Sequence, residues 1–133
     1  SYQLLEPSLE WRGLTFKAGR EVLGGNGHYG FSTPYATLHA FNGWADRFTT
    51  TPADGLDDRY AGATGKIGSA TWATSWHDFH ADQGGRHYGS ESDASISYPL
   101  RAGLTALLKI ADYRSDGFSS DERKLWVSLE YHY

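Results

Sequence analysis

Hydrophobic and polar residues alternate along much of the chain, most clearly near the C-terminus. There, apolar or aromatic residues occupy every second position, namely Leu125, Val127, Leu129, Tyr131 and Tyr133. Successive side chains of a β-strand point to opposite faces of a sheet, so this alternation predicts a strand with one apolar face. Trp126 is the one bulky residue on the polar side of this strand.

The same period of two recurs upstream and predicts further strands. Clear alternation covers the segments 5–11, 14–19, 94–100 and 105–113. Two more segments, about 56–67 and 69–80, have the composition of strands but less distinct faces, and the outer face of 56–67 cannot be assigned. We therefore expect an all-β fold of about seven strands.

The connections between these strands alternate in length. Short turns are expected near residues 11–13, 66–69 and 100–103, and longer links at about 24–54, 81–87 and 115–121. Outer-membrane barrels have tight turns at one end and long loops at the other. The pattern favours an antiparallel up-and-down transmembrane β-barrel. A soluble or surface β-sandwich, stacking its Trp and Tyr rings on sugars as a carbohydrate-binding module, is the alternative, because a sandwich alternates equally.

Composition narrows the choice of function. The 133 residues fit one domain, and the net charge of −4 argues against a nucleic-acid partner. Cysteine is absent, which excludes disulfides and thiolate chemistry. No apolar run approaches the roughly 20 residues of a spanning helix, but an alternating strand needs no such run. We expect no enzyme activity, no cofactor and no bound metal.

Several segments, taken in order, resemble the C-terminal part of the alginate-export-like family of Gram-negative outer-membrane barrel proteins. The similar stretches are 14–23, 29–48, 76–82, 88–91 and 124–133. The resemblance implies a bacterial outer-membrane location, contact with outer-membrane lipid and delivery by the barrel-assembly machinery. In that family, a final strand that alternates and ends in an aromatic residue is the assembly signal, which here maps to Leu125, Val127, Leu129, Tyr131 and Tyr133.

Seven strands are too few for a closed barrel, which has an even number and at least eight. We therefore expect residues 1–133 to be the C-terminal segment of a single larger outer-membrane barrel domain. Two alternatives remain open: another chain supplies the remaining strands, or Tyr35–Phe41 forms an eighth strand.

The polar side of the strands would line a water-filled lumen. The expected pore-lining residues carry both signs of charge: Glu6, Glu10, Lys17, Arg20, Arg59, Glu91, Asp93, Lys109, Lys124 and Glu130. Arg20 and Arg59 are the least certainly placed. The long link at about 24–54 is too aromatic for a solvated tether, so we expect it to fold inward as a constriction loop through Tyr29, Phe31, Tyr35, Phe41, Trp44 and Phe48.

These expectations describe a porin or channel for passive diffusion of small hydrophilic solutes. The family resemblance also implies export of anionic saccharides for some members. Such a cargo requires a mainly cationic lumen, and the acidic balance of this chain does not display one.

Three weaker motifs have simpler interpretations. Gly25–Gly30 matches the dinucleotide pattern G-x-G-x-x-G, but Pro34 follows where a helix would have to begin, so a loop is expected. The pair Glu91 and Asp93 has a spacing compatible with glycosidase carboxylates and equally with a charged lumen. The remaining possibilities are metal sites: His77, Asp78, His80 and Asp82 for a transition metal, and Asp78, Asp82, Glu91 and Asp93 for calcium. His77 would point away from Asp78 and His80 on a strand, which disfavours the first set.

Overall fold

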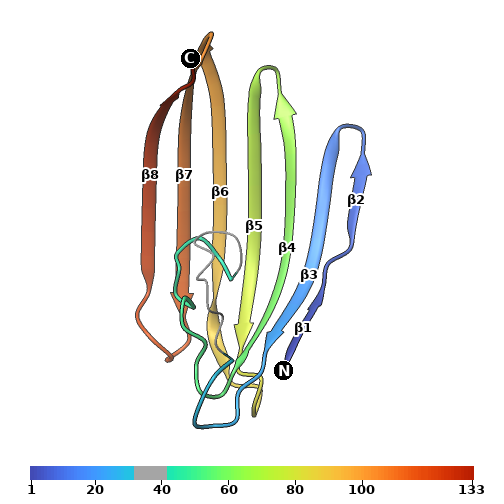
Figure 1. Ribbon diagram of the computed structural model, residues 1–133, viewed down its shortest axis with the longest axis vertical. Helices are drawn as coiled ribbons and strands as arrows, with labels where there is room; N and C mark the ends of the chain where they lie inside the picture. Colours follow the sequence, from blue (N-terminus) through green and yellow to red (C-terminus); the bar gives the residue numbers. More distant parts are fainter. Residues whose placement is uncertain (32–41) are drawn as a thin grey trace.

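The protein is all-β, and its strands form one antiparallel sheet in the computed structural model, which describes residues 1–31 and 42–133 (Figure 1). The eight strands are β1 (Tyr2–Leu5), β2 (Ser8–Trp11), β3 (Leu14–Leu23), β4 (Leu56–Ile67), β5 (Ala70–His80), β6 (His87–Arg101), β7 (Leu104–Ser115) and β8 (Glu122–Tyr131). The described residues contain no helix long and apolar enough to cross a membrane.

Strands β3 to β8 lie beside one another in chain order, and β1 and β2 both pair with β3. The predicted N-terminal strand is divided in two because Pro7 lies between its halves and has no N–H for the ladder. This division makes eight strands where about seven were expected. The sheet is open, with β1 and β2 along one edge and β8 along the other.

The turns and loops are sorted between the two ends of the sheet, as the sequence predicts. The hairpins β2–β3, β4–β5 and β6–β7 close in tight turns at one end, whereas residues 24–31, 81–86 and 116–121 lie at the other, which we call the loop end (Figure 1). Arg12 and Gly13 form the first tight turn with φ angles of 50° and 79°. Left-handed backbone of this kind is favoured in two-residue hairpins because its twist matches that of the strands.

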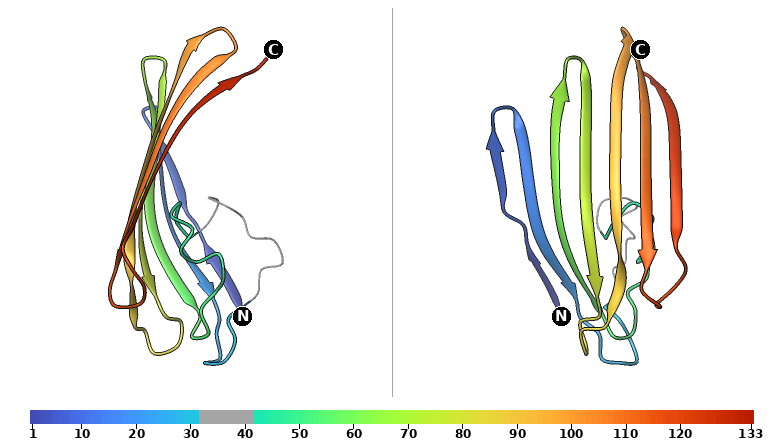
Figure 2. Two further views of the ribbon diagram at one scale, coloured as in Figure 1. Left: turned by 90° about the vertical axis from the view of Figure 1, so that its left-hand side faces the viewer. Right: turned by 180° about the vertical axis from the view of Figure 1, so that it is seen from behind.

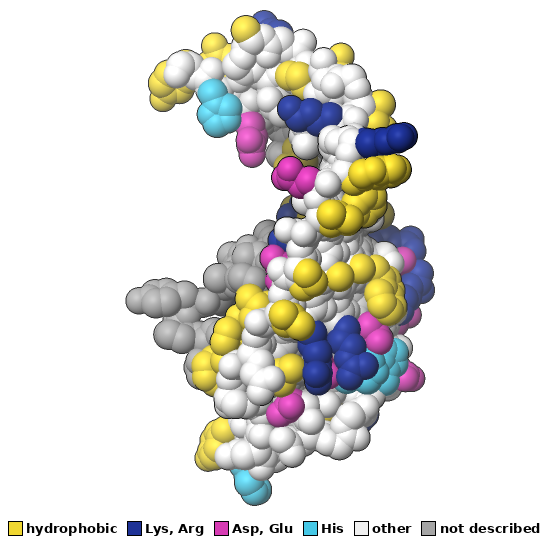
Figure 3. All heavy atoms as spheres, turned by 90° about the vertical axis from the view of Figure 1, so that its right-hand side faces the viewer, with side chains coloured by type: hydrophobic (Ala, Val, Ile, Leu, Met, Phe, Trp, Pro, Cys, Tyr) yellow, Lys and Arg dark blue, Asp and Glu magenta, His cyan; other side chains and the backbone are white. Residues whose placement is uncertain are grey.

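The sheet is curved, and residues 42–55 lie on its concave side (Figure 2). Large apolar side chains remain exposed on the opposite, convex face, toward the tight-turn end. This apolar band comprises Leu5, Leu9, Trp11, Phe16, Ile67, Trp76, Ile96, Tyr98, Leu100, Leu108, Ile110, Leu125, Val127, Leu129 and Tyr131. In Figure 3 the end of the sheet curls over a hollow into which acidic side chains project, with hydrophobic side chains along the outer curve.

The apolar band stops before the loop end. Asp112 and Arg123 pair across β7 and β8 on the convex face, and the Arg123 guanidinium donates to the Asp112 carboxylate at 3.1 Å. Ser92 is the partner of Asp112 on β6. On β6, β7 and β8 the convex face is polar from this level toward the loop end, so residues of these strands beyond it lie outside the band. Leu5, on the edge strand β1, lies farther toward the loop end.

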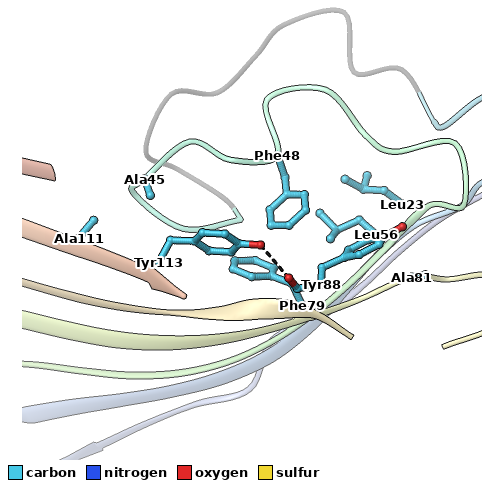
Figure 4. Packing of buried hydrophobic residues seen from close by; sticks show 9 residues of the cluster. All are labelled: Leu23, Ala45, Phe48, Leu56, Phe79, Ala81, Tyr88, Ala111 and Tyr113. Atoms are coloured by element: carbon cyan, nitrogen blue, oxygen red, sulfur yellow. Dashed lines mark hydrogen bonds between the residues drawn. The ribbon is translucent and has the colours of Figure 1, made fainter. Parts of the chain in front are cut away.

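The buried core lies at the loop end, between the concave face and the segment 42–55. Phe48 packs there against Phe79, Tyr88 and Tyr113, and the Tyr113 hydroxyl donates to the Tyr88 carbonyl at 2.9 Å (Figure 4). The core is small because it holds a segment against one face of a sheet, whereas a sandwich would bury a whole second sheet.

Candidate functional site

A row of ionisable side chains crosses the concave face at the level of the segment 42–55. It is positioned by strand register, since Glu21 pairs with Asp58, and His77 pairs with Glu91. We call this row the ionisable belt, and its members are Glu21, Asp58, His77, Glu91, Asp93, Lys109 and Lys124. The four carboxylates and the imidazole are buried.

His77 is held between two acidic neighbours in the belt. Its Nδ1 lies 3.0 Å from both Asp58 carboxylate oxygens, and its Nε2 lies 3.9 Å from an Asp93 oxygen. The ring also stacks on Tyr60, with 5.3 Å between ring centroids. These contacts bring a histidine and two carboxyl groups together from three neighbouring strands, β4, β5 and β6.

The segment Asn42–Gly55, which we call the docked segment, covers the middle of the belt. The Ala45 N–H donates to Glu91 Oε1 at 2.6 Å, and the Trp44 N–H donates to Asp93 Oδ2 at 3.3 Å. Left-handed backbone at Asn42 and Gly43, with φ of 59° and 82°, leads into this contact. A Cβ on Gly43 would approach the Glu91 carboxyl within 2.6 Å, so the close approach requires glycine.

Basic side chains hold the other side of the docked segment. Lys124 Nζ donates to the Ala45 carbonyl, and the Lys109 ammonium lies 4.2 Å from the centroid of the Trp44 ring. Arg47 forms an ion pair with Glu122 on β8, with 2.7 Å between Nη1 and Oε2. The docked segment is therefore fastened to β6, β7 and β8 by groups of both signs.

On β6, Glu91 lies loopward of the apolar band, next to Tyr113 in register. Burial, together with the nearby Asp93 carboxylate, raises the pKa of Glu91 to about 9. Glu91 therefore holds a proton more strongly than an exposed carboxyl does, and its Oε1 accepts from the Ala45 N–H. Protonation removes one of the negative charges that the sequence assigned to the lumen.

A second part of the concave face lies nearer the open edge formed by β1 and β2. Lys17 pairs with Glu6 at 3.0 Å, and the Tyr60 hydroxyl also donates to the Glu6 carboxylate. A half-open cavity of about 140 Å³ lies between this group and the docked segment; it is lined by Glu6, Lys17, Asn42, Trp44, Tyr60, Ser75 and His77. The docked segment thus leaves a polar space beside the wall.

The structure divides the predicted pore-lining residues between the two faces. Eight share the concave face by strand register and contacts: Glu6, Glu10, Lys17, Glu91, Asp93, Lys109, Lys124 and Glu130. Arg20 and Arg59 do not. They pair with each other across β3 and β4 on the convex face, where both bind Asp57, so their assignment to the lumen was wrong. Glu21, Asp58 and His77 belong to the belt but were not predicted as part of it.

The predicted constriction residues are also divided. Trp44 and Phe48 lie in the docked segment on the concave face. Phe31 stacks on Tyr2, with 6.0 Å between ring centroids, and Tyr29 is largely exposed. Tyr35 and Phe41 lie outside the described residues, as does the possible eighth strand.

The residues of the predicted assembly signal lie on or beside the outermost strand. Leu125, Val127, Leu129 and Tyr131 are exposed along the convex face of β8, and Tyr133 follows the strand. Between them, Trp126 faces the concave side, where the Lys109 ammonium lies 5.4 Å from its ring centroid.

The weaker motifs separate in space. His77 lies on the opposite face from Asp78 and His80, and Glu91 and Asp93 lie on the opposite face from Asp78, so neither metal set predicted from sequence converges. Gly25–Gly30 is a loop closed by one bridge between these two glycines. Instead, the structure groups Asp78 and His80 with His87. Sequence spacing did not include His87, although a hairpin reversing at 82–85 would bring it beside His80.

Comparisons with protein-family models, with curated proteins and with solved structures found no match to this chain.

Proposed function

We propose that this chain is part of the wall of a bacterial outer-membrane channel through which small hydrophilic solutes diffuse passively. In this proposal the apolar band contacts lipid, and the concave face lines water. The docked segment lies inside the lumen and narrows it.

The observation that carries the proposal is the difference between the two faces of one curved sheet. The convex face leaves Leu5, Ile67 and Val127 each more than 70% exposed, and no described layer covers them. Isolated apolar residues are common on soluble proteins, but a continuous band around a sheet marks an interaction surface. A β-strand crosses the hydrocarbon layer in about 9–11 residues, which the ten residues of β8 match.

The arrangement of the loops supports the same function. Within the described residues, the tight turns lie at one end and the connections 81–86 and 116–121 at the other, as in outer-membrane barrels with short periplasmic turns and long external loops. The docked segment also starts from the loop end, and a loop that folds inward to constrict a barrel would enter from that end.

The charges on the concave face favour small solutes of mixed character. Lys17, Lys109 and Lys124 lie among a larger number of carboxylates, of which Glu91 has a raised pKa. A pathway for anionic saccharides requires a predominance of cations along the wall. We therefore propose passive diffusion without selectivity for anionic saccharides.

The carbohydrate-binding sandwich is the weaker candidate. It requires a second sheet packed on the apolar residues, whereas all eight strands of the described residues belong to one sheet. Its aromatic rings would also have to gather in one groove, but the exposed rings of the convex face are spread across the sheet from Trp11 to Tyr131.

The two faces can be tested separately, because the chain contains no cysteine and a single introduced one can be labelled uniquely. Val127→Cys places a nitroxide label on the convex face of β8, and Ser128→Cys places one on the concave face. In outer-membrane vesicles, we expect position 127 to be accessible to oxygen and protected from a water-soluble nickel chelate. We expect the reverse at position 128.

Equal protection of the two positions from the nickel chelate would contradict the proposal, as would extraction of the protein without detergent. Purified protein should also conduct in planar bilayers. A soluble sandwich would show neither conductance nor oxygen accessibility from lipid, and would instead change its tryptophan fluorescence on adding oligosaccharide.

A further inference from the structure

Asp78, His80 and His87 form a group of three side chains at the loop end, away from the ionisable belt. Asp78 and His80 lie two residues apart on β5, so they share a face, and His87 begins β6 directly across the hairpin. A register shift between Phe79 and His80 makes His80 the partner of His87. One potential ligand atom from each residue lies within 4.8 Å of the other two.

The internal contacts of the group leave donor atoms facing one another. His87 Nε2 lies 2.8 Å from Asp78 Oδ1, and His80 Nδ1 lies 3.8 Å from Asp78 Oδ2. The two imidazole rings are 4.9 Å apart between centroids. His80 Nδ1 is buried and has no hydrogen-bond partner within the described residues. A buried nitrogen with no partner is costly, and a ligand at this point would satisfy it.

A fourth residue orients the group from a different loop. The carboxylate of Asp116, which follows β7, lies 2.9 Å from His87 Nδ1. A carboxylate on one imidazole nitrogen directs the other nitrogen toward a metal, as is common around zinc-bound histidines. Here the other nitrogen is Nε2, which points at Asp78. The neighbouring cation does not compete for Asp78, because Arg59 pairs with Asp57 at 3.0 Å.

We propose that Asp78, His80 and His87 bind a divalent transition metal ion of the zinc class. Two imidazoles and one carboxylate are a ligand set that suits Zn²⁺ and leaves one tetrahedral position for water. Ligands about 2.1 Å from a tetrahedral ion lie about 3.4 Å from one another. The group must therefore contract by roughly 1.4 Å at its widest point, which partly exposed side chains at a strand end can do.

Metal binding would join two of the loop-end connections. Asp78, His80 and His87 flank the turn 81–86, and Asp116 belongs to the link that leads into β8. The site lies outside the hollow and does not depend on the proposed channel. Its test therefore needs no conductance and can fail or succeed independently of that proposal.

The test is a calorimetric titration of the detergent-solubilised protein with Zn²⁺. We expect one ion per chain for the wild type, and at least a tenfold loss of affinity for His80→Gln and for His87→Gln. A loss of about tenfold is also expected for Asp116→Asn, at the low end of the 10- to 100-fold that positioning residues of metal sites commonly contribute. Saturating Zn²⁺ should also slow amide exchange in residues 81–86.

His132→Gln is the matched control, because His132 also lies near a carboxylate, 3.9 Å from Glu130, but is remote from the site. Its affinity for Zn²⁺ should equal that of the wild type. The far-ultraviolet circular dichroism spectrum of β-structure checks that each variant is folded. The proposal is wrong if the folded wild type binds no Zn²⁺ at millimolar concentration, since the group is then only a network of ion pairs. It is equally wrong if His80→Gln and His87→Gln bind as tightly as the wild type.

Discussion

Phe48 is the side chain on which docking of the segment 42–55 most depends. It is 5% exposed and contacts four aromatic rings, those of Phe79, Tyr88, Tyr113 and Phe118. Truncating a buried phenylalanine to alanine typically costs about 3–5 kcal/mol. Phe48→Ala should therefore reduce the ratio of docked to undocked segment roughly a hundred- to several-thousand-fold.

The other contacts of the docked segment are together no stronger than the contribution of Phe48. A hydrogen bond such as that from the Ala45 N–H contributes about 1 kcal/mol, and the Lys109–Trp44 contact about 0.5–1 kcal/mol at a partly exposed site. The ion pair of Arg47 with Glu122 is partly exposed and adds about 1 kcal/mol or less. Together they amount to a few kcal/mol, which is comparable to the loss at Phe48 alone.

The consequence is measurable in two ways. Residues 42–55 of Phe48→Ala should exchange amide hydrogens faster than in the wild type, and single-channel conductance in planar bilayers should rise. Tyr29→Ala is the control, because Tyr29 belongs to the same long connection but is 79% exposed. If Phe48→Ala folds and shows wild-type exchange in this segment, the energetic reasoning is refuted. If exchange rises while conductance stays the same, the docked segment does not narrow the pathway.

Three further predictions concern other parts of the sheet. The pKa of Glu91 is raised from 4.5 to about 9, so its contribution to docking is fully present below the lower value and is lost as the pH rises through the higher one. Proteolysis of the docked segment should therefore increase between pH 7 and pH 10. Glu91→Gln should abolish this increase. Gly89→Ala should lower the temperature at which half of the protein loses its folded gel mobility, and should lower it far more than Gly84→Ala does. Both glycines have positive φ, but only at Gly89 would a Cβ meet a backbone oxygen at 2.2 Å. Leu129→Lys should reduce the fraction of protein recovered in outer membranes, since a lysine facing lipid costs about 2–4 kcal/mol at mid-bilayer, whereas Ser128→Lys on the concave face should not.

The strands and their faces are predictable where the chain alternates strictly. The segments from Ala94 to Tyr131 have side chains on the predicted sides, including Trp126, because a period of two maps directly onto a pleated sheet. The docking of an aromatic-rich connection is also predictable, since a solvated tether does not carry Trp44 and Phe48.

Residues without a clear alternating context could not be placed in the same way. The small side chains of β4 blur its two faces, so Asp58 was not recognised in the belt and Arg59 was assigned to the wrong face. Pro7 divides the first strand because it lacks a backbone N–H donor, and the alternation of apolar and polar residues does not reveal this break. His87 needs the register of the β5–β6 hairpin, and a shift of that register near His80 cannot be read from residue types alone.

The two free edges of the sheet carry unpaired backbone N–H and C=O groups, whose cost depends on whether water or lipid surrounds them. In β8, alternate residues of a ten-residue strand direct their N–H and C=O groups away from β7, with no described strand beside them. In water these groups are solvated, but in hydrocarbon each unpaired group costs several kcal/mol. Roughly ten such groups would cost more than the 5–15 kcal/mol that stabilises a typical domain. If the convex face contacts lipid as we propose, both edges must therefore be paired with further strands, contributed by a longer barrel or by another chain. Under this proposal, the apolar band and the open edges lead to the same requirement, namely that the sheet forms one arc of a closed wall.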